Sequence, residues 1–462
     1  MKAYVTILFA ATLVSCGNNG DQITSTAEQH GEQQVNEVLH HADWSKNMSI
    51  YEVNVRQYSP EGTLDAVRKD LPRLKELGVG ILWLMPIHPI GKENRKGSLG
   101  SYYSARDYKA VNPEFGTLED FKLFVNDAHS YGMKVIIDWV ANHSGFDNVW
   151  TKEHKDYYLL DSLGNLQPPT GTDWWDVAQL NYENEDTRVA MIDAMKFWLV
   201  EGQIDGFRCD VADFVPVDFW NRARKELSAV NPDIFMLAEA ENPLHHIEAF
   251  DMSYSWELMH VMNEIAKGNK TLNDLDTYLA KEDTNFVANA YRMTFTTNHD
   301  ENSWNGTVFE RYGDGHLAFA TLAFNLGTPL IYSGQEAGME RRLRFFDKDT
   351  IPWDGYKYAD FYSKMMNVHR DQEALWNGPY GGKIERIKTA NDDVVYAFIR
   401  KQGASEVLTI VNLSATPTTV VFEESISGDF TSIFNQFKLT VFANGELPLD
   451  AWGYQVFVKN PA

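Results

Sequence analysis

Cysteine is scarce in this chain of 462 residues, which contains only Cys16 and Cys209. Basic residues are also few: 41 Lys and Arg stand against 65 Asp and Glu, and the formal net charge is -24. A surface that follows nucleic-acid phosphates needs clustered Lys and Arg, so the charge balance excludes nucleic acid as a partner. An acidic surface instead suits a neutral substrate.

Long hydrophobic runs are missing as well. The apolar run from Tyr4 to Val14 is too short to span a bilayer as a stable helix, and no later stretch is long and apolar enough to do so. With Lys2 before it and Cys16 after it, the run resembles a bacterial lipoprotein signal, so we expect residues 1–16 to be a signal peptide that ends at a lipidated Cys16. An ordinary signal peptide with a coincidental cysteine is the alternative.

If Cys16 is lipidated, Cys209 has no partner and no disulfide supports the fold. Acyl chains on one residue hold a protein at a membrane surface without a spanning helix. We therefore expect an exported protein, periplasmic or on the outer-membrane surface, that touches the membrane only through its lipid anchor. Residues 17–45 are polar and carry few large apolar side chains, which predicts a flexible tether.

Between residues 46 and 377, short apolar segments alternate with amphipathic ones. Such alternation is typical of strands that pair in parallel and are joined by helices. Seven clear strands and one weaker strand fit the α/β class as a closed (β/α)8 TIM barrel. The strands are predicted at 49–55, 80–85, 134–138, 204–209, 234–238, 250–254 (the weak one), 293–297 and 329–332. The helices are predicted at 64–77, 118–131, 187–201, 216–230, 316–325 and 358–372.

Two segments interrupt this alternation. Residues 139–181 contain no long crossover helix and are rich in Trp, Tyr, Asp, Gly and Pro, so we expect an inserted subdomain after strand three that builds part of a site. Residues 378–462 show only strands and turns, which predicts a C-terminal antiparallel β-sandwich domain. Its strands are predicted at 394–400, 407–412, 418–422, 437–442 and 453–458.

Charged and imidazole side chains directly follow four of the predicted barrel strands. The active site of a (β/α)8 barrel lies at the carboxyl ends of its strands, so these side chains should meet at one rim. A single Asp at a strand end is usually a cap or turn residue, but repetition on four strands indicates a site, because converging charges are costly unless they are used. The residues are Asp138, His143, Arg208, Asp210, Glu239, His299 and Asp300.

These four segments resemble, in order, the four signature regions of the α-amylase family of retaining glycoside hydrolases. The resemblance runs from about Ile50 to the C-terminus. It also includes four shorter motifs, at 100–108 (GSYYSARDY), 179–181 (QLN), 327–329 (GTP) and 334–336 (GQE).

The resemblance implies the roles of three carboxyl groups. Asp210 matches the nucleophile, Glu239 the general acid/base, and Asp300 the carboxylate that holds sugar hydroxyls in the transition state. Retention of configuration follows from two displacements between carboxyl groups about 5–5.5 Å apart. The nucleophile must be ionised, and Arg208, two residues before Asp210 on the same strand, can stabilise its charge. Asp138 matches the carboxylate that orients Arg208.

Further positions match the family's sugar contacts. The resemblance implies that His143, His299 and Arg208 contact the sugar in the cleavage subsite and that Tyr103 stacks beneath it. An aromatic platform with polar donors suits a ring that has apolar faces and a hydroxyl rim. Asn142 matches a residue that binds a structural calcium in many members. The insertion offers carboxylates for such a site, but their spacing does not define one.

The implied function is hydrolysis of α-1,4-glucosidic bonds in starch-like glucans or maltooligosaccharides. Many endo-acting members carry a Lys-His pair shortly after the nucleophile, and this chain has Asp213-Phe214 there instead. The pattern therefore leaves open a neopullulanase- or cyclomaltodextrinase-like activity, an α-1,6-glucosidase and a transglycosylase. A different class of function is a non-catalytic surface lipoprotein that binds glycans.

Overall fold

The computed structural model describes residues 39–460. The predicted signal peptide, the lipidation site Cys16 and tether residues 17–38 lie outside the described residues. Within the described part of the chain, no helix is both long enough and apolar enough to cross a membrane.

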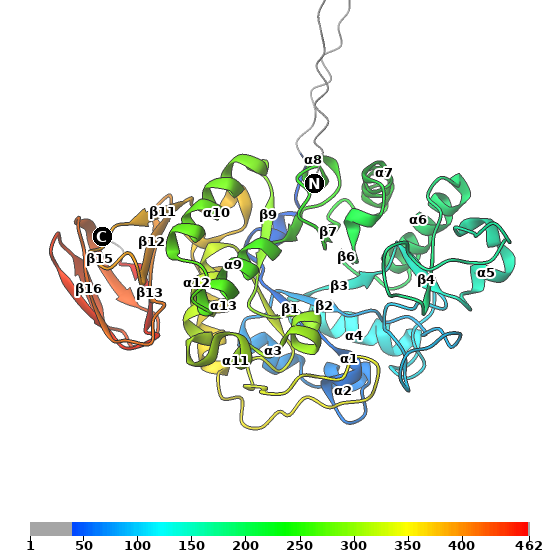
Figure 1. Cartoon of the computed structure of the whole chain (residues 1–462), viewed down its shortest axis with the longest axis horizontal. Helices are drawn as coiled ribbons and strands as arrows, with labels where there is room; N and C mark the ends of the chain where they lie inside the picture. Colours follow the sequence, from blue (N-terminus) through cyan, green and yellow to red (C-terminus); the bar gives the residue numbers. More distant parts are fainter. Residues whose placement is uncertain (1–38, 461–462) are drawn as a thin grey trace, which may run out of the picture. The chain divides into compact units, whose positions relative to one another are not determined.

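Eight parallel strands close into a barrel, which confirms the predicted TIM barrel and includes the strand that the sequence marked only weakly. Figure 1 shows these strands at the centre of the helices that connect them. Around the barrel the strands follow the order β1-β10-β9-β8-β7-β6-β3-β2. Their bounds are β1 Ile50–Val53, β2 Ile81–Leu84, β3 Lys134–Trp139, β6 Gly206–Cys209, β7 Phe235–Ala238, β8 Met252–Tyr254, β9 Tyr291–Thr294 and β10 Thr328–Tyr332.

The six predicted helices are all present, but one of them is divided, and two long helices, Trp256–Ala266 and Leu272–Asn285, were not predicted. The helix predicted at 64–77 is divided into α2 and α3 just before Pro72. Proline has no backbone N–H and would break a continuous helix at this position, but it is tolerated in the first turn of a helix, where it lies in α3. The helices are α1 Val55–Tyr58, α2 Leu64–Arg68, α3 Leu71–Leu77, α4 Leu118–Ser130, α5 Val149–Glu153, α6 Glu185–Val200, α7 Val217–Ser228, α8 His245–Glu248, α9 Trp256–Ala266, α10 Leu272–Asn285, α11 Val308–Tyr312, α12 His316–Leu326 and α13 Ala359–Asp371.

The barrel interior is filled by side chains rather than open. Alternate residues of each strand point inward, so apolar residues from different strands form one cluster. The glycine at the start of β6 allows close strand packing, because a Cβ at Gly206 would lie 1.8 Å from the carbonyl oxygen of Phe235 in β7. The buried cluster contains Ile50, Ile81, Trp83, Ile136, Phe235, Leu237, Met252, Tyr254, Met259, Tyr291, Met293, Phe295 and Leu330.

The predicted tether extends too far toward the barrel. Residues 39–45 pack against the barrel: the buried His41 places Nδ1 2.8 Å from Oδ1 of Asp251, and its ring stacks on Tyr291 with centroids 4.2 Å apart. The polar composition predicted a tether because it does not reveal that one histidine, His41, anchors the segment to the barrel.

The segment after β3 forms a small subdomain of its own. Strands β4 (His143–Gly145) and β5 (Val177–Gln179) pair antiparallel, and the chain between them contains α5. Both strands lie beside the carboxyl end of β3, so the insertion contributes to the rim where the polar strand ends meet.

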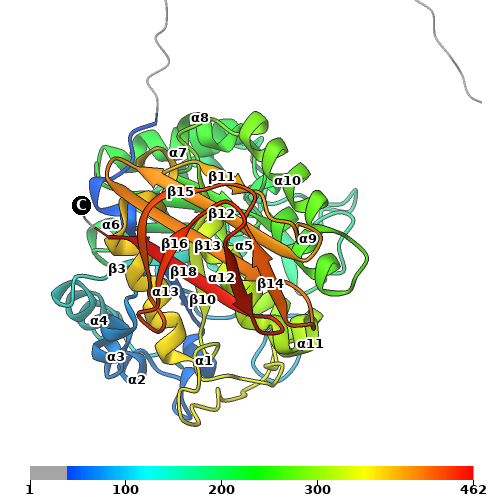
Figure 2. The same ribbon diagram turned by 90° about the vertical axis from the view of Figure 1, so that its left-hand side faces the viewer.

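The C-terminal region is antiparallel throughout, as predicted, and its core joins two sheets (Figure 2). Three strands escaped the sequence prediction: β11 (Ile384–Ile387), β15 (Ile426–Ser432) and β17 (Glu446–Leu449). All three are partly exposed, and β15 contains a bulge, so their alternation is weak. The larger sheet follows the order β11-β12-β13-β18-β15-β16, and the smaller pairs β14 with β17. The other bounds are β12 Val395–Gln402, β13 Ser405–Asn412, β14 Thr418–Val421, β16 Lys438–Val441 and β18 Tyr454–Lys459.

Candidate active site

One buried arginine joins three of the carboxyl groups that the sequence singled out. Arg208, in β6, is fully buried, and its Nη1 lies 2.8 Å from Asp138 Oδ1 and 3.0 Å from Asp210 Oδ1. Its Nη2 lies 2.9 Å from Glu239 Oε2, and its Nε donates to the hydroxyl of Tyr254 at 3.1 Å. Side chains from three of the predicted strand ends, those of β3, β6 and β7, therefore meet around one guanidinium, and Tyr254 of β8 joins them.

Two of these carboxyl groups each keep one oxygen free. Asp210 Oδ1 and Glu239 Oε2 are held by Arg208, and the backbone N–H of Val211 also donates to Glu239 Oε2 at 2.8 Å. Among the described residues, Asp210 Oδ2 and Glu239 Oε1 have no hydrogen-bond partner. Both side chains are largely buried but still reach solvent, at 9% and 12% exposure. The site therefore presents two fixed carboxyl groups with one available oxygen each.

The local charge balance favours retention of a proton in this cluster. Burial raises the pKa of Asp210 well above its ordinary value, the neighbouring Glu239 raises it further, and Arg208 opposes both. Burial also raises the pKa of Asp138 to about 6, against the influence of Arg208. Because one guanidinium faces three carboxyl groups, a proton held between them near neutral pH relieves their repulsion.

Arg208→Leu should destabilise the protein by about 3–5 kcal/mol, because it leaves buried carboxylates without their cation. The carboxyl pKa values should then rise further, so the deficit should be small in acid and grow as the pH increases through them. Urea unfolding at pH 5 and pH 8 measures this. The control Arg222→Leu removes a half-exposed pair with Glu185 and should cost no more than about 1 kcal/mol. Equal deficits at both pH values would contradict the charge argument.

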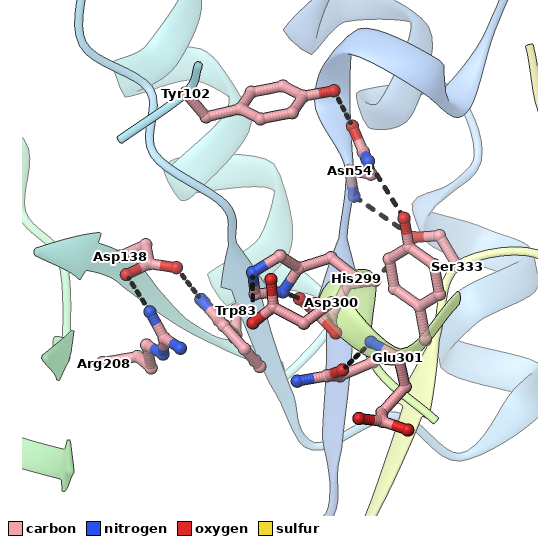
Figure 3. Close-up of polar contacts among 12 residues, drawn as sticks. Asn54, Trp83, Tyr102, Asp138, Arg208, His299, Asp300, Glu301 and Ser333 are labelled. Atoms are coloured by element: carbon pink, nitrogen blue, oxygen red, sulfur yellow. Dashed lines mark hydrogen bonds and ion pairs between the residues drawn. The ribbon is translucent and has the colours of Figure 1, made fainter. Parts of the chain in front are cut away.

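A second group of side chains contacts this cluster, and Figure 3 shows its members His299 and Asp300 together with Asp138 and Arg208. Tyr103 donates through its hydroxyl to Asp138 Oδ2 at 3.1 Å, and Nε2 of His299 lies 2.7 Å from that hydroxyl oxygen. The same Nε2 lies 3.3 Å from Asp300 Oδ2, and the rings of Tyr103 and His299 stack with centroids 5.4 Å apart. Asp300 is about one-third exposed, so its carboxylate is accessible to a ligand.

His143 and Asn142 lie at the start of the insertion. His143 is buried, and burial lowers its pKa to about 3, so the ring is neutral. The side-chain amide of Asn142 contacts His143 Nδ1 at 3.1 Å, and the ring of Trp174 lies 5.4 Å from that of His143. The structure thus places His143 beside an aromatic side chain of the insertion.

Two carboxylates of the insertion that could bind calcium already have partners. Within residues 39–460, no cluster of three or more acidic, histidine or cysteine side chains could hold a metal ion. The carboxylate of Asp176 is paired with Lys96 at 3.0 Å, and that of Asp156 accepts from Asn184 at 2.8 Å.

Sequence reasoning missed three residues of the site. Trp83 donates through its indole N–H to Asp138 Oδ2 at 3.2 Å, Tyr254 contacts Arg208, and Glu52 in β1 contacts Nδ1 of His299 at 2.5 Å. Only Glu52 carried a signal, because an acidic residue in an otherwise apolar strand is costly to bury without a partner.

Comparisons with known proteins found matches to a family model, to related sequences and to solved structures. Residues 19–377 match the family model described as the alpha amylase catalytic domain. Alpha-amylase MalA of Haloarcula japonica is 27% identical over 397 residues, covering 82% of this chain and 57% of that protein. Neopullulanase 2 of Thermoactinomyces vulgaris is also 27% identical over 397 residues, covering 80% of this chain and 66% of that protein. The chain thus spans less than two thirds of either relative.

A solved structure matches the whole fold. The crystal structure of an alpha-amylase from Lactobacillus plantarum superposes with a TM-score of 0.81 at 30% identity. The match covers 90% of this chain and all of that one. The likeness therefore includes the C-terminal sheets as well as the barrel.

Proposed function

The chain belongs to the alpha-amylase family of glycoside hydrolases, and on that premise we propose that it hydrolyses α-1,4-glucosidic bonds in starch-like glucans or maltooligosaccharides with retention of configuration. The observation that supports this best is the contact of one guanidinium with Asp138, Asp210 and Glu239. Carboxyl groups held on a shared cation lie near each other, and glycoside hydrolysis uses such a pair on either side of the glycosidic bond.

In the first step, Asp210 Oδ2 attacks the anomeric carbon while Glu239 Oε1 donates its proton to the leaving oxygen. The bond from carbon to the leaving oxygen breaks, and a glycosyl ester forms on Asp210. In each of these two carboxyl groups, the reacting oxygen is the one that has no hydrogen-bond partner among the described residues. Arg208 holds the other oxygen of Asp210 and limits its rotation.

In the second step, Glu239 Oε1 accepts a proton from water as the water oxygen attacks the anomeric carbon. The ester bond to Asp210 breaks, and the two inversions together restore the α configuration. The shared guanidinium stabilises whichever carboxyl group is ionised at each stage, since both contact it throughout.

Recognition of the ring in the cleavage subsite falls to the second group of residues. We propose that Tyr103 stacks beneath the sugar, while His299 and Asp300 bind its hydroxyl groups. His143 is neutral and offers one ring nitrogen for a further hydroxyl contact. Carboxylates and imidazoles that bind hydroxyls during ring distortion contribute to the transition state itself.

Large exposed rings near the centre support an oligomeric substrate. Phe214 is 56% exposed, and its short helical turn (η3, Ala212–Phe214) is tied to the backbone of Glu239. Trp304, 51% exposed, contacts Phe345, which stacks on Tyr103. Exposed rings near the carboxyl groups suit further sugar units of an oligomer.

The proposal is tested by the products formed from maltoheptaose, pullulan and isomaltose. We expect cleavage of maltoheptaose, with the new reducing ends first appearing as α anomers by proton NMR. Preferred cleavage of pullulan would favour a neopullulanase-like enzyme, cleavage of isomaltose an α-1,6-glucosidase, and longer products a transglycosylase. Binding without turnover would favour a non-catalytic glycan-binding protein.

A further inference from the structure

Glu52 lies inside the barrel, in the middle of the apolar strand β1. Its side chain is fully buried, and Oε1 lies 2.5 Å from Nδ1 of His299. Among the described residues, its second oxygen, Oε2, has no hydrogen-bond partner. A buried carboxylate with one unsatisfied oxygen is expensive, so its interaction with His299 must offset that cost.

Both ring nitrogens of His299 face acceptors. Nδ1 faces the Glu52 carboxylate, and Nε2 faces the hydroxyl oxygen of Tyr103 at 2.7 Å and Asp300 Oδ2 at 3.3 Å. The hydroxyl hydrogen of Tyr103 is already donated to Asp138, so Nε2 must supply the proton in their contact. An imidazole that donates from both nitrogens is an imidazolium.

The charges around the ring agree with this protonation state. Burial lowers the pKa of His299, but Asp300 and Glu52 outweigh it and raise the pKa to about 9, while Arg208 opposes them. Asp138, from β3, is a further carboxylate facing the ring. The phenols of Tyr254 and Tyr332 also face this part of the barrel, and burial raises their pKa values well above the ordinary range, so both are neutral.

We propose that Glu52 is a positioning residue, which holds His299 as an imidazolium so that Nε2 keeps an N–H that a sugar hydroxyl in the cleavage subsite can share with Tyr103 and Asp300. This role rests on the proposed function, because it assigns His299 to sugar binding. A charged donor binds a hydroxyl or a developing negative charge more strongly than a neutral one. Without the carboxylate, the ring could take the neutral form with a bare Nε2, which accepts instead of donating.

Glu52→Gln tests the proposal, because the amide has the same shape and can still accept from Nδ1 but carries no charge. We expect His299 to titrate near pH 9 in the wild type and at least one pH unit lower in the variant, measured by NMR of histidine-labelled protein. His299→Gln identifies the resonance. This readout needs no turnover, so it stands even if the proposed activity fails.

The proposal also predicts how the ratio of kcat/KM between Glu52→Gln and the wild type changes with pH. At acidic pH the imidazolium persists in both proteins, and kcat/KM should be similar. As the pH rises toward 8, the variant loses the donor first. With a pKa one unit lower, its kcat/KM should fall about twofold relative to the wild type at pH 8, and the ratio should approach about tenfold above pH 9. A merely structural role would give a loss that does not vary with pH.

Glu336→Gln is the matched control. Glu336 is also fully buried with an unpartnered Oε2 in the described part of the chain, but it contacts Tyr51 and Arg73 instead of His299. Neutralising it should leave the pKa of His299 unchanged. If Glu52→Gln does not fold, Glu52→Asp keeps the charge and should retain a raised pKa. A wild-type His299 that titrates near its ordinary value would overturn the proposal.

Discussion

Asp210→Asn should lower kcat on α-glucans by at least about 10⁴-fold while the protein remains folded. An amide oxygen is a poor nucleophile, so no glycosyl ester can form and the double displacement cannot begin. The asparagine occupies the same volume and can still accept from Arg208, so packing around the barrel rim is preserved. Substrate binding should survive, because the contacts of Tyr103, His299 and Asp300 with the sugar are unchanged.

The measurement combines single-turnover kinetics with mass spectrometry of the intact protein. The wild type should show a transient glycosyl adduct with a slowly deglycosylating substrate, and Asp210→Asn should show none. Asp213→Asn is the control, because Asp213 lies in the same segment but pairs with His245 at 2.9 Å. A near-wild-type rate for Asp210→Asn would remove Asp210 from the mechanism.

Much of the site could be predicted from the sequence, because its polar residues directly follow the apolar runs that form the strands. An apolar run followed directly by Asp210, Glu239 or His299-Asp300 identifies both a strand and the end of it that bears the chemistry. In a barrel all such ends share one rim, so four local patterns predict one spatial cluster. The contacts of Arg208 with Asp138, Asp210 and Glu239 confirm that these strand ends meet.

Contacts between residues that are far apart in the sequence could not be predicted in this way. Glu52 and His299 are 247 residues apart, and nothing local to either residue specifies the other. The packing of residues 39–45 depends on Asp251 and Tyr291, which lie far along the chain. Strand β15 was missed because half-exposed, bulged strands lose the alternation that marks a strand.

Glu239→Gln should lower kcat on α-glucans by about 10²–10⁴-fold, and the size of the loss should depend on the leaving group. A sugar alkoxide is a poor leaving group unless its oxygen is protonated, whereas fluoride leaves readily without protonation. With α-maltosyl fluoride the first displacement by Asp210 should therefore stay fast. The second step should become rate-limiting, because no base remains to take a proton from water, and the glycosyl ester on Asp210 should accumulate.

A nucleophile that needs no deprotonation separates the two steps. Azide should attack the ester directly, restore turnover of the fluoride by Glu239→Gln and yield an α-glycosyl azide, since that attack is the second inversion. Glu241→Gln, two residues further along, is the control: Glu241 pairs with Arg292, so its loss should not produce leaving-group dependence. Equal losses in the rate of ester formation on glucan and on fluoride would show that Glu239 is not the proton donor, because removing a general acid slows the first step only where the leaving oxygen requires its proton.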